Sequence, residues 1–342
     1  MKTGILKRAA GMVLALSLGF SALGGCAASA FSGSSGDSAV SAISGSGDDS
    51  AVSASSGRGD NSAVSAETSP PAAETDPAPL RDWTTIPIVA HALGTVDGRR
   101  ETNSKDAFLA SYEAGQRILE VDLQLTSDGV LVARHDWDQI SYYNLEQEYA
   151  GVMDHETFMN TPICYYYTPL DIDGLLELLV SHPDAYLVTD SKDTNEAAIR
   201  SQCKALAQAV ERTGDPGLWD RIIVQIYREE MLDWVREETP VANFIFTLYQ
   251  TAKPDYAAIG AFCQSNGIRV VTMDLSRFSQ LSGENSRLLH SYGCLIYLHT
   301  VNRVLDMVVS TWGADGFYSD YVTPDQFHAA ESGESRPYLK QG

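Results

Sequence analysis

The chain has 342 residues, 44% of them hydrophobic, and a formal net charge of −21. Its length and hydrophobic content allow one large folded domain or two small ones, with a sizeable core. A surface this acidic excludes nucleic acid as a partner, and an anionic substrate would need local positive charge from a metal ion or a few placed Lys and Arg side chains.

The first residues predict an export signal. Three basic residues among the first eight are followed by an apolar run at 12–23 that is short for a bilayer span. The run ends in LGGC at 23–26, which resembles the lipobox of bacterial lipoproteins, with Cys26 as the lipidated residue. An ordinary signal peptide with an incidental Cys26 is the alternative. We expect residues 1–25 to be a lipoprotein signal peptide, and the protein to be extracytoplasmic and anchored to the membrane through Cys26.

Residues 26–82 predict a flexible linker. They are rich in Ser, Gly, Ala and Pro, and an imperfect repeat (GDSAV, GDDSAV, GDNSAV) begins at Gly36, Gly47 and Gly59. Such a segment cannot bury enough surface to offset the entropy lost on ordering. We therefore expect a tether that holds a folded domain away from the membrane.

Folded sequence begins near Trp83, and we expect a single domain over residues 83–335. Short β-rich runs alternate with helical patterns, of which 195–214 and 255–267 end at Gly, as helices often do. This alternation predicts a parallel sheet covered by helices. The strand-like runs are 86–91, 117–123, 130–136, 185–192, 221–227, 244–250, 269–275, 295–302 and 316–320.

One link between these nine runs is too short for a parallel connection. Ser127-Asp128-Gly129 joins 117–123 to 130–136, and Asp-Gly between two strand-like runs is a hairpin signal. The run at 130–136 is therefore expected to return antiparallel, outside the barrel wall. Eight parallel strands remain, which predicts an α/β fold of the closed (β/α)₈ TIM barrel type.

Polar side chains gather where these strands end, the face that carries the catalytic residues in such barrels. Glu120 and Asp122 are two apart on one strand and point to the same side. Facing carboxylates are costly unless a cation or a proton lies between them, and an all-oxygen ligand set favours Ca²⁺ or Mg²⁺ over zinc. Salt-bridged barrel residues are the alternative. The polar residues at strand ends are His91, Glu120, Asp122, Asp190, Lys192, Gln225, Tyr249, Gln250, Asp274, His299 and Asn302.

The block from His91 through Asp136 resembles the signature of the glycerophosphodiester phosphodiesterase family. It has a His after the first strand, an Asn at a helix start, E-x-D, T-x-D-G and then H-D. Downstream motifs continue the resemblance in order through 86–324: LVTDSK, VQIY, LHTVN and GADGFYSD. The resemblance implies a (β/α)₈ barrel of the phospholipase C-like phosphodiesterase type.

The resemblance also implies roles for individual residues. His91 and His135 match the pair of histidines that serve as general acid and base. Glu120, Asp122 and Asp190 match the ligands of a divalent metal, Ca²⁺ or Mg²⁺. The implied substrate-binding residues are Lys192, near the phosphate, and Asn103, Gln225, His299 and Asn302.

Three positions depart from the family pattern. The Arg that follows the first His is Ala92 here, so one bidentate phosphate contact is missing. The Glu before the Asn is Thr102, although Glu101 is one position away, and Asp190 is one methylene shorter than the usual Glu. Arg99 or Arg100 is a candidate replacement for the missing Arg. These changes leave the fold prediction intact and bear on the substrate.

Together these features predict metal-dependent hydrolysis of a glycerophosphodiester or related phosphodiester, a lipid or wall-polymer head group, outside the cytoplasm. Two alternatives are a lipoprotein on the same scaffold that binds a phosphodiester or sugar phosphate without catalysis, and a phospholipase C-type lyase that forms a cyclic phosphate. The residues do not distinguish water from a substrate hydroxyl as the nucleophile.

Two smaller predictions concern the rest of the domain. An insertion at about 137–170 is expected over the barrel mouth, where Tyr165-Tyr166-Tyr167 would form a substrate lip or pack within the insertion. Cys164, Cys203, Cys263 and Cys294 show no metal-binding spacing, and we expect buried free thiols rather than disulfides.

Overall fold

The structure, a computed structural model, describes residues 81–333. The predicted signal peptide, Cys26 and all but the end of the predicted linker lie outside the described residues. Among the described residues, no helix is long and apolar enough to cross a membrane.

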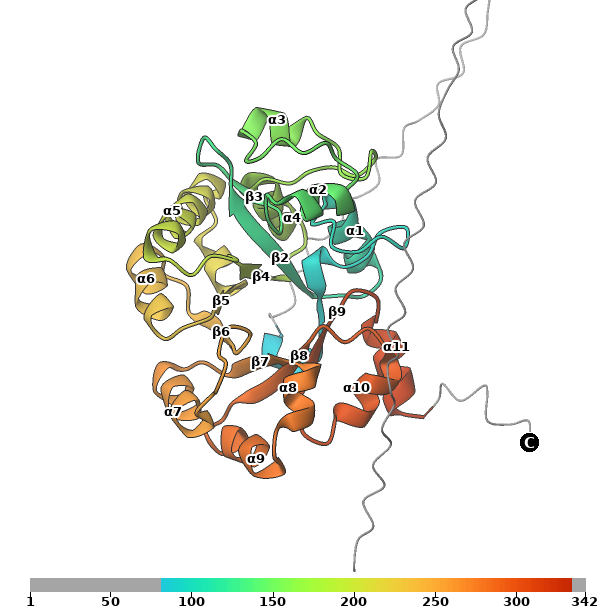
Figure 1. Cartoon of the computed structure of the whole chain (residues 1–342), viewed down its shortest axis with the longest axis vertical. Coiled ribbons are helices and arrows are strands. Elements are labelled where there is room, and N and C mark those ends of the chain that lie inside the picture. The colour runs from blue at the N-terminus through green and yellow to red at the C-terminus, as the bar shows by residue number, and fades with distance from the viewer. Residues whose placement is uncertain (1–80, 334–342) are drawn as a thin grey trace, which may run out of the picture. The chain divides into compact units, whose positions relative to one another are not determined.

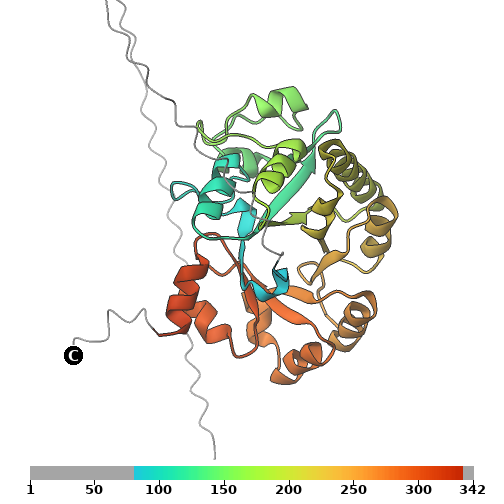
Figure 2. The same ribbon diagram turned by 180° about the vertical axis from the view of Figure 1, so that it is seen from behind.

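The described residues form a barrel of parallel strands, visible from opposite sides in Figures 1 and 2. The strands are β1 (Ile88–Ala90), β2 (Ile118–Leu125), β3 (Leu131–Ala133), β4 (Tyr186–Asp190), β5 (Ile222–Ile226), β6 (Asn243–Thr247), β7 (Val270–Asp274), β8 (Leu295–His299) and β9 (Gly316–Ser319). Their order is β1-β9-β8-β7-β6-β5-β4-β2-β3, and pairing of β1 with β2 closes the barrel. The eight-stranded parallel barrel predicted from the sequence is confirmed.

The strand β3 is the exception to the parallel order, as the short link predicted. It pairs antiparallel with β2, with Leu125 opposite Leu131. Gly129 has φ +86° in the connecting turn, a backbone conformation that glycine adopts without steric cost. The residues after β3 then carry His135 and Asp136 back toward the barrel.

Helices surround the barrel in Figure 1 and cover the outer faces of its strands. They are α1 (Lys105–Glu113), α2 (Gln139–Asn144), α3 (His155–Met159), α4 (Ile172–Ser181), α5 (Glu196–Thr213), α6 (Glu230–Glu238), α7 (Tyr256–Asn266), α8 (Leu275–Gln280), α9 (Gly283–Ser291), α10 (Val304–Ser310) and α11 (Pro324–Glu331). Three 3₁₀ helices are η1 (Trp83–Thr85), η2 (His91–Leu93) and η3 (Pro216–Asp220).

Local sequence explains where the longest of these helices begins and ends. The Asn195 side chain accepts a hydrogen bond from the backbone N–H of Ala198, which caps the start of α5. Gly214 ends α5 in the left-handed conformation, and Gly267 ends α7 in the same way. These helix ends agree with the glycine signals in the sequence.

The side chains inside the barrel change from apolar to polar along the barrel axis. Near the strand starts the interior is filled by apolar side chains, and Trp83 of η1 packs among them; its indole N–H donates to Asn243, the first residue of β6. Successive inward positions on β2 are Ile118, Glu120 and Asp122, so the interior becomes polar toward the strand ends. The strand residues of this apolar interior cluster are Val89, Ile118, Tyr186, Val188, Ile223, Ile245, Val270, Tyr297 and Tyr318.

A larger apolar core lies between the barrel wall and the helices. Cys164, Cys203, Cys263 and Cys294 are all buried and free, which confirms the expectation of free thiols. In the predicted insertion, Tyr165 and Tyr166 are exposed while Tyr167 is buried. The role of this segment as a lip over the barrel mouth stays a prediction.

Candidate active site

A cavity of about 440 Å³ opens at the carboxyl ends of the barrel strands. Its walls come from β1, β2, β4, β5, β6, β8 and β9 and from the segment after β3, so the topology brings together residues far apart in sequence. The lining residues are His91, Glu120, His135, Asp136, Asp190, Lys192, Gln225, Tyr227, Thr247, Tyr249, Gln250, His299, Thr300 and Tyr318.

Three buried carboxylates converge on one side of this cavity. Asp122 of β2 lies opposite Asp190 of β4 in the parallel register, and Glu120 is two residues earlier on β2. One oxygen of each carboxylate lies within 4.8 Å of one oxygen of the other two. Lys192 approaches this group, with its Nζ 2.7 Å from Asp122 Oδ1 and 2.7 Å from Asp190 Oδ2.

The single positive charge of Lys192 does not balance the three buried carboxylates. Burial, with repulsion from Asp122, raises the pKa of Glu120 to about 8. Burial opposes ionisation of Asp122 as well, but the Lys192 ammonium and the two histidines outweigh it and lower the pKa of Asp122 to about 2. Glu120 Oε2 accepts the Ala92 N–H at 2.8 Å, while Oε1 accepts no hydrogen bond from the described residues. The three carboxylates therefore fit a divalent, oxygen-binding metal.

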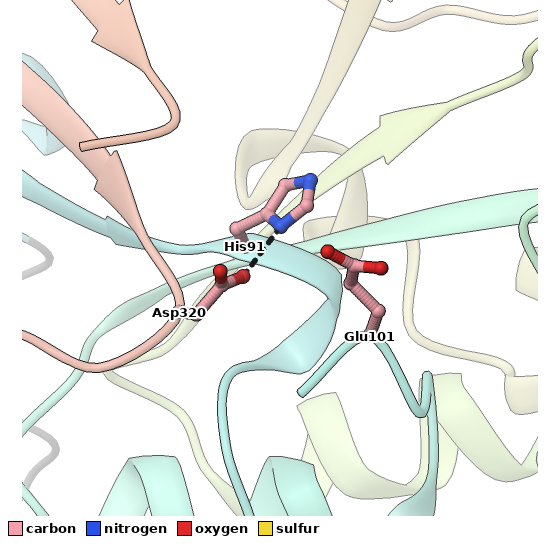
Figure 3. A group of neighbouring side chains, drawn as sticks. All are labelled: His91, Glu101 and Asp320. Atoms are coloured by element: carbon pink, nitrogen blue, oxygen red, sulfur yellow. Dashed lines mark hydrogen bonds and ion pairs between the residues drawn. The ribbon is translucent and has the colours of Figure 1, made fainter. Parts of the chain in front are cut away.

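His91 follows β1 and is held by a second carboxylate group, drawn in Figure 3. Its Nδ1 lies 2.8 Å from Oδ1 of Asp320, the residue after β9. Burial lowers the pKa of His91, but the Asp320 hydrogen bond and the charges of Glu120 and Asp122 outweigh it and raise the pKa to about 9. With Nδ1 bound to Asp320, Nε2 is the ring nitrogen left for the cavity.

Asp320 is itself fixed by its neighbours. Asn302 Nδ2 donates to Asp320 Oδ2 at 2.6 Å, and the Asp320 N–H donates to Asn302 Oδ1 at 2.8 Å. Arg100 approaches the same oxygen at 3.4 Å. His91, Glu101 and Asp320 also lie close enough to share an ion. Because the Asp320 carboxylate already has three polar partners, we interpret the group as one that orients His91.

His135 lies across the cavity in a more open setting. Its Nδ1 lies 2.6 Å from Oδ2 of the neighbouring Asp136, and its side chain is 51% exposed. Asp136 Oδ1 accepts the Asp138 N–H at 2.8 Å, which fixes the carboxylate. The remaining ring nitrogen, Nε2, is available to the cavity.

The other predicted residues divide into two groups. Lys192, Gln225 and His299 line the cavity, whereas Asn103 and Asn302 are not among its lining residues. Asn103 Nδ2 donates to Asp122 Oδ2 at 2.9 Å, and its Oδ1 accepts the Asp122 N–H at 3.0 Å. Asn103 and Asn302 therefore hold site carboxylates in place.

His299 stays neutral in the cavity wall. Burial lowers its pKa to about 4, and its Nε2 has no hydrogen-bond partner among the described residues. The ring of Tyr249 lies beside it, with the two ring centroids 6.1 Å apart. A neutral imidazole with a free nitrogen is suited to bind a substrate hydroxyl.

Several site residues were missed in the sequence. Asp320 is the last residue of the GADGFYSD motif. It is a polar residue directly after a strand, like the site residues that the sequence did indicate. Tyr227 donates its hydroxyl to Asp190, and Tyr318 donates to Gln225 Oε1 at 3.1 Å. Both tyrosines lie within motifs of the family resemblance, Tyr227 in VQIY directly after β5 and Tyr318 in GADGFYSD on β9, but neither was singled out in the sequence.

The candidate replacements for the missing Arg do not line the catalytic cavity. Arg99 Nη1 pairs with Glu146 at 2.6 Å, and Arg100 is held near Asp320. At position 92, where the family pattern has Arg, the backbone N–H of Ala92 donates a hydrogen bond to Glu120. Lys192, His91 and His135 are therefore the cationic or cation-forming groups that act on the buried carboxylates within residues 81–333.

Comparisons with known proteins agree on one family. The model of the "Glycerophosphoryl diester phosphodiesterase family" matches residues 96–323, a range that contains the three carboxylates and His135 and begins after His91. A glycerophosphodiester phosphodiesterase of Bacillus subtilis (strain 168) is 26% identical over 245 residues, which cover 66% of this chain and 81% of the relative.

Solved structures share the fold. A glycerophosphodiester phosphodiesterase from Parabacteroides distasonis superposes with a TM-score of 0.58 at 14% identity, over 74% of this chain and 99% of its own. A phosphodiesterase from Oleispira antarctica, in complex with the product sn-glycerol-3-phosphate, superposes with a TM-score of 0.58 at 15% identity, over 72% of this chain and 96% of its own.

Proposed function

The chain belongs to the glycerophosphoryl diester phosphodiesterase family of phosphoric diester hydrolases, and from this premise we propose that it hydrolyses a glycerophosphodiester or related phosphodiester with His91 and His135 as acid and base. One observation carries the proposal. Two histidines, one lysine and the carboxylates of Glu120 and Asp190 line a single cavity, and the buried carboxylate of Asp122 lies beside those two.

The different surroundings of the two histidines support different roles for them. His91, whose pKa is raised to about 9, is protonated at neutral pH and would donate the Nε2 proton to the departing alkoxide. His135, with Nδ1 tied to Asp136, would accept a proton from water at Nε2 as the water oxygen attacks phosphorus. The new P–O bond forms as the P–O bond to the alcohol breaks, and the proton gained by His135 returns to solvent.

We propose that Glu120, Asp122 and Asp190 hold a divalent metal, Ca²⁺ or Mg²⁺. When bound, such an ion supplies charge neutralisation and Lewis-acid polarisation at the phosphate oxygens. Lys192 keeps its proton, because Asp122 and Asp190 outweigh burial and hold its pKa above the usual range. Its ammonium is placed to contact a phosphate oxygen beside the carboxylates.

The names of the relatives support a glycerol-containing substrate. The Bacillus subtilis relative is named as a glycerophosphodiester phosphodiesterase, and the Oleispira antarctica enzyme holds sn-glycerol-3-phosphate as product. The cavity of this chain offers Gln225, Thr247 and His299 as uncharged partners for hydroxyl groups. We propose a deacylated glycerophosphodiester, because an acyl chain would need an apolar wall.

Turnover by variants tests the mechanism. Purified protein would be assayed on glycerophosphodiesters with Ca²⁺, Mg²⁺ or a chelator, with release of the alcohol as the readout. We expect activity to require the metal and to fall by roughly 10²- to 10⁴-fold in His91→Ala and in His135→Ala. His290→Ala, which removes an outer histidine paired with Asp315, is the control. Unchanged activity in either catalytic variant, at an unchanged melting temperature, would contradict the proposed roles.

A further inference from the structure

The segment that carries His135 begins with a buried arginine. Arg134 directly follows β3 and is 1% exposed, and it is not among the residues that line the catalytic cavity. A guanidinium stays charged in proteins, so its burial costs free energy unless its surroundings compensate. Burial lowers the pKa of Arg134, which reflects that cost. A residue that is costly to bury is expected where it serves a function.

Aromatic rings rather than carboxylates surround this guanidinium. Its Cζ lies 4.3 Å from the ring centroid of Tyr142 and 4.6 Å from the ring of Trp137, distances at which an aromatic face attracts a cation. Both rings pack in a small apolar cluster that includes Phe158 of α3. The side chain of Arg134 is therefore held by the insertion that follows His135.

The hydrogen bonds of Arg134 close around His135. Its Nε–H donates to the Asp136 carbonyl at 2.7 Å, a bond between the residues on either side of His135. Its backbone N–H donates to the Asp122 carbonyl at 2.8 Å, which ties the start of the segment to β2. Nη1 donates to Gln147 Oε1 at 3.0 Å, while Nη2 has no partner among the described residues. The segment that carries the proposed base is thus fixed to β2 and to the insertion through one residue.

Asp136 connects Arg134 to the His135 ring. Its carbonyl accepts the Arg134 Nε–H, its Oδ1 accepts the Asp138 N–H at 2.8 Å, and its Oδ2 lies 2.6 Å from His135 Nδ1. The side chain of His135 is 51% exposed, so packing alone leaves its ring less constrained than a buried one. The direction of its Nε2 therefore depends on the Asp136 carboxylate, and the position of that carboxylate depends in part on Arg134.

We propose that Arg134 is a positioning residue for the general base: its guanidinium, held beside Trp137 and Tyr142, fixes the Asp136 carbonyl and so orients the His135 ring toward the reacting phosphorus. This inference rests on the proposed function. It adds a residue outside the catalytic cavity on which the base depends, and it gives the aromatic side chains of the insertion a part in catalysis.

Arg134→Met tests whether this bond matters to turnover. Methionine is also long and unbranched, but it offers no donor to the Asp136 carbonyl. We expect kcat to fall roughly 10- to 100-fold and KM to change less than about 2-fold, because a misplaced base weakens the transition state and not substrate binding. The substrate is the glycerol 3-phosphate ester of p-nitrophenol, whose release is followed by absorbance. An unchanged kcat would overturn the proposal.

A second variant keeps the test valid if Arg134→Met does not fold. Arg134→Lys retains a cation beside the two rings but lacks the planar guanidinium that places a donor at Nε. We expect a loss of kcat of the same kind, again with little change in KM. Full activity in a folded Arg134→Lys would show that charge alone suffices, and it would overturn the role assigned to the bond with Asp136.

Arg221 provides the matched control. It is 5% exposed and precedes β5, so it lies at the end of the barrel opposite the cavity. Its Nη1 donates to three backbone carbonyls, those of Leu179, His182 and Ala185. Arg221→Met also removes a buried guanidinium bonded to the backbone, and we expect it to lower the melting temperature but not kcat. A loss of kcat equal to that of Arg134→Met would contradict a specific effect.

Combination with His135→Ala separates positioning from general support of the site. If Arg134 acts through His135, Arg134→Met should lower the residual kcat of His135→Ala by less than about 2-fold. Nitrophenolate departs with little need for a proton, which keeps the residual turnover measurable. A further loss as large as in the wild-type background would show that Arg134 supports the metal site or the fold instead, and would overturn the proposal.

Failure of the proposed function is distinguishable from failure of this inference. If the folded wild-type chain hydrolysed none of the diesters, the hydrolase proposal would fail. Crystal structures of Arg134→Met and Arg221→Met would then test the positioning alone. A His135 ring that leaves Asp136 or takes several orientations in Arg134→Met, and in that variant only, would support the inference. Any other result would overturn it.

Discussion

His91 and His135 are the same residue type in the same cavity, yet they differ in burial and in the partners that surround them. His91 is bound to the buried Asp320 and faces the field of Glu120 and Asp122, which raise its pKa above the ordinary 6.5 against the opposing effect of burial. His135 is half exposed and bound to Asp136. The pairing of an acid and a base therefore comes from the partners of two like residues.

Asp320→Asn tests the source of the His91 charge. The amide oxygen still accepts the Nδ1–H, but the negative charge that raises the pKa of His91 is lost. Because the proposed mechanism needs protonated His91, activity is lost as pH rises through its pKa, near 9 in the wild type. We expect the alkaline limb of kcat to move down by about 1 pH unit or more. Asp315→Asn, at the partner of His290, should leave the limb in place; a shift there would contradict a specific effect.

Glu120 links the metal site to stability. Burial raises its pKa from 4.5 to about 8, so the folded metal-free protein binds this proton more tightly than the unfolded chain does. The contribution of Glu120 to stability is then most favourable below pH 4.5 and is lost as pH rises toward 8.

Glu120→Gln should remove that pH dependence. At pH 8.5 the metal-free variant is expected to melt higher than the metal-free wild type, by roughly 2 to 4 °C for each kcal/mol of repulsion removed. Adding Ca²⁺ or Mg²⁺ should raise the melting temperature of the wild type but not of the variant. Scanning calorimetry with and without a chelator measures both effects, and equal metal stabilisation of the two proteins would contradict a ligand role for Glu120.

Among the strands, the inward-facing side chains change from apolar residues that fill the barrel to polar residues that form the site. Ile118, Glu120 and Asp122 of β2 point the same way, and the apolar residue lies near the strand start with the carboxylates toward its end. The same change occurs on β4, from Tyr186 and Val188 to Asp190. Each strand thus contributes to the apolar filling of the barrel and to the site above it.

The strand β9 shows how closely this interior is packed. A Cβ added at Gly316 would lie 2.5 Å from the ring of Tyr297 in β8. Gly316→Ala should therefore lower stability by about 1 to 3 kcal/mol, because the ring is confined within the barrel. At Gly283, where a new Cβ meets only the end of the Arg287 side chain at 3.4 Å, alanine should be nearly neutral. Urea unfolding of both variants checks the contrast, and equal stabilities would contradict it.

At the scale of the whole molecule, closure of the barrel brings the site together. The register of β1 against β9 and β2 brings His91 to Asp320 on one side and the Ala92 N–H to Glu120 on the other. The hairpin of β2 and β3 adds His135 from outside the barrel wall. Under the proposed function, a chain with a formal charge of −21 would bind an anionic diester through the few local cations that the barrel brings to this site.

The N-terminal sequence motivates a prediction about the location of the whole molecule. We propose that the protein acts outside the cytoplasm, anchored through Cys26 of the LGGC motif. Cys26→Ser should move the protein from the membrane fraction to the soluble fraction while leaving kcat on a soluble diester unchanged, since the anchor lies outside the barrel. Fractionation with an N-terminal mass measurement tests this, and a wild-type protein that is soluble and unmodified would contradict it.

The sequence predicted the barrel well because its signals are local. Apolar runs with polar ends, helices that stop at Gly214 and Gly267, and the Asp128-Gly129 turn each depend on residues within one or two turns of chain. Of the polar residues at the strand ends, eight line the cavity: His91, Glu120, Asp190, Lys192, Gln225, Tyr249, Gln250 and His299. His135, which the family resemblance indicated, lines it as well.

The order of strands and helices, the antiparallel β3 and the face that carries the candidate site could all be predicted from local sequence patterns. Only the tertiary structure decided that Asp320 orients His91 across 229 residues, that Asn103 and Asn302 hold carboxylates, and that Arg99 and Arg100 lie outside the catalytic cavity. The physical reason is that secondary structure follows local periodicity, whereas charge, burial and hydrogen bonding at a site depend on which distant strands the closed barrel brings together.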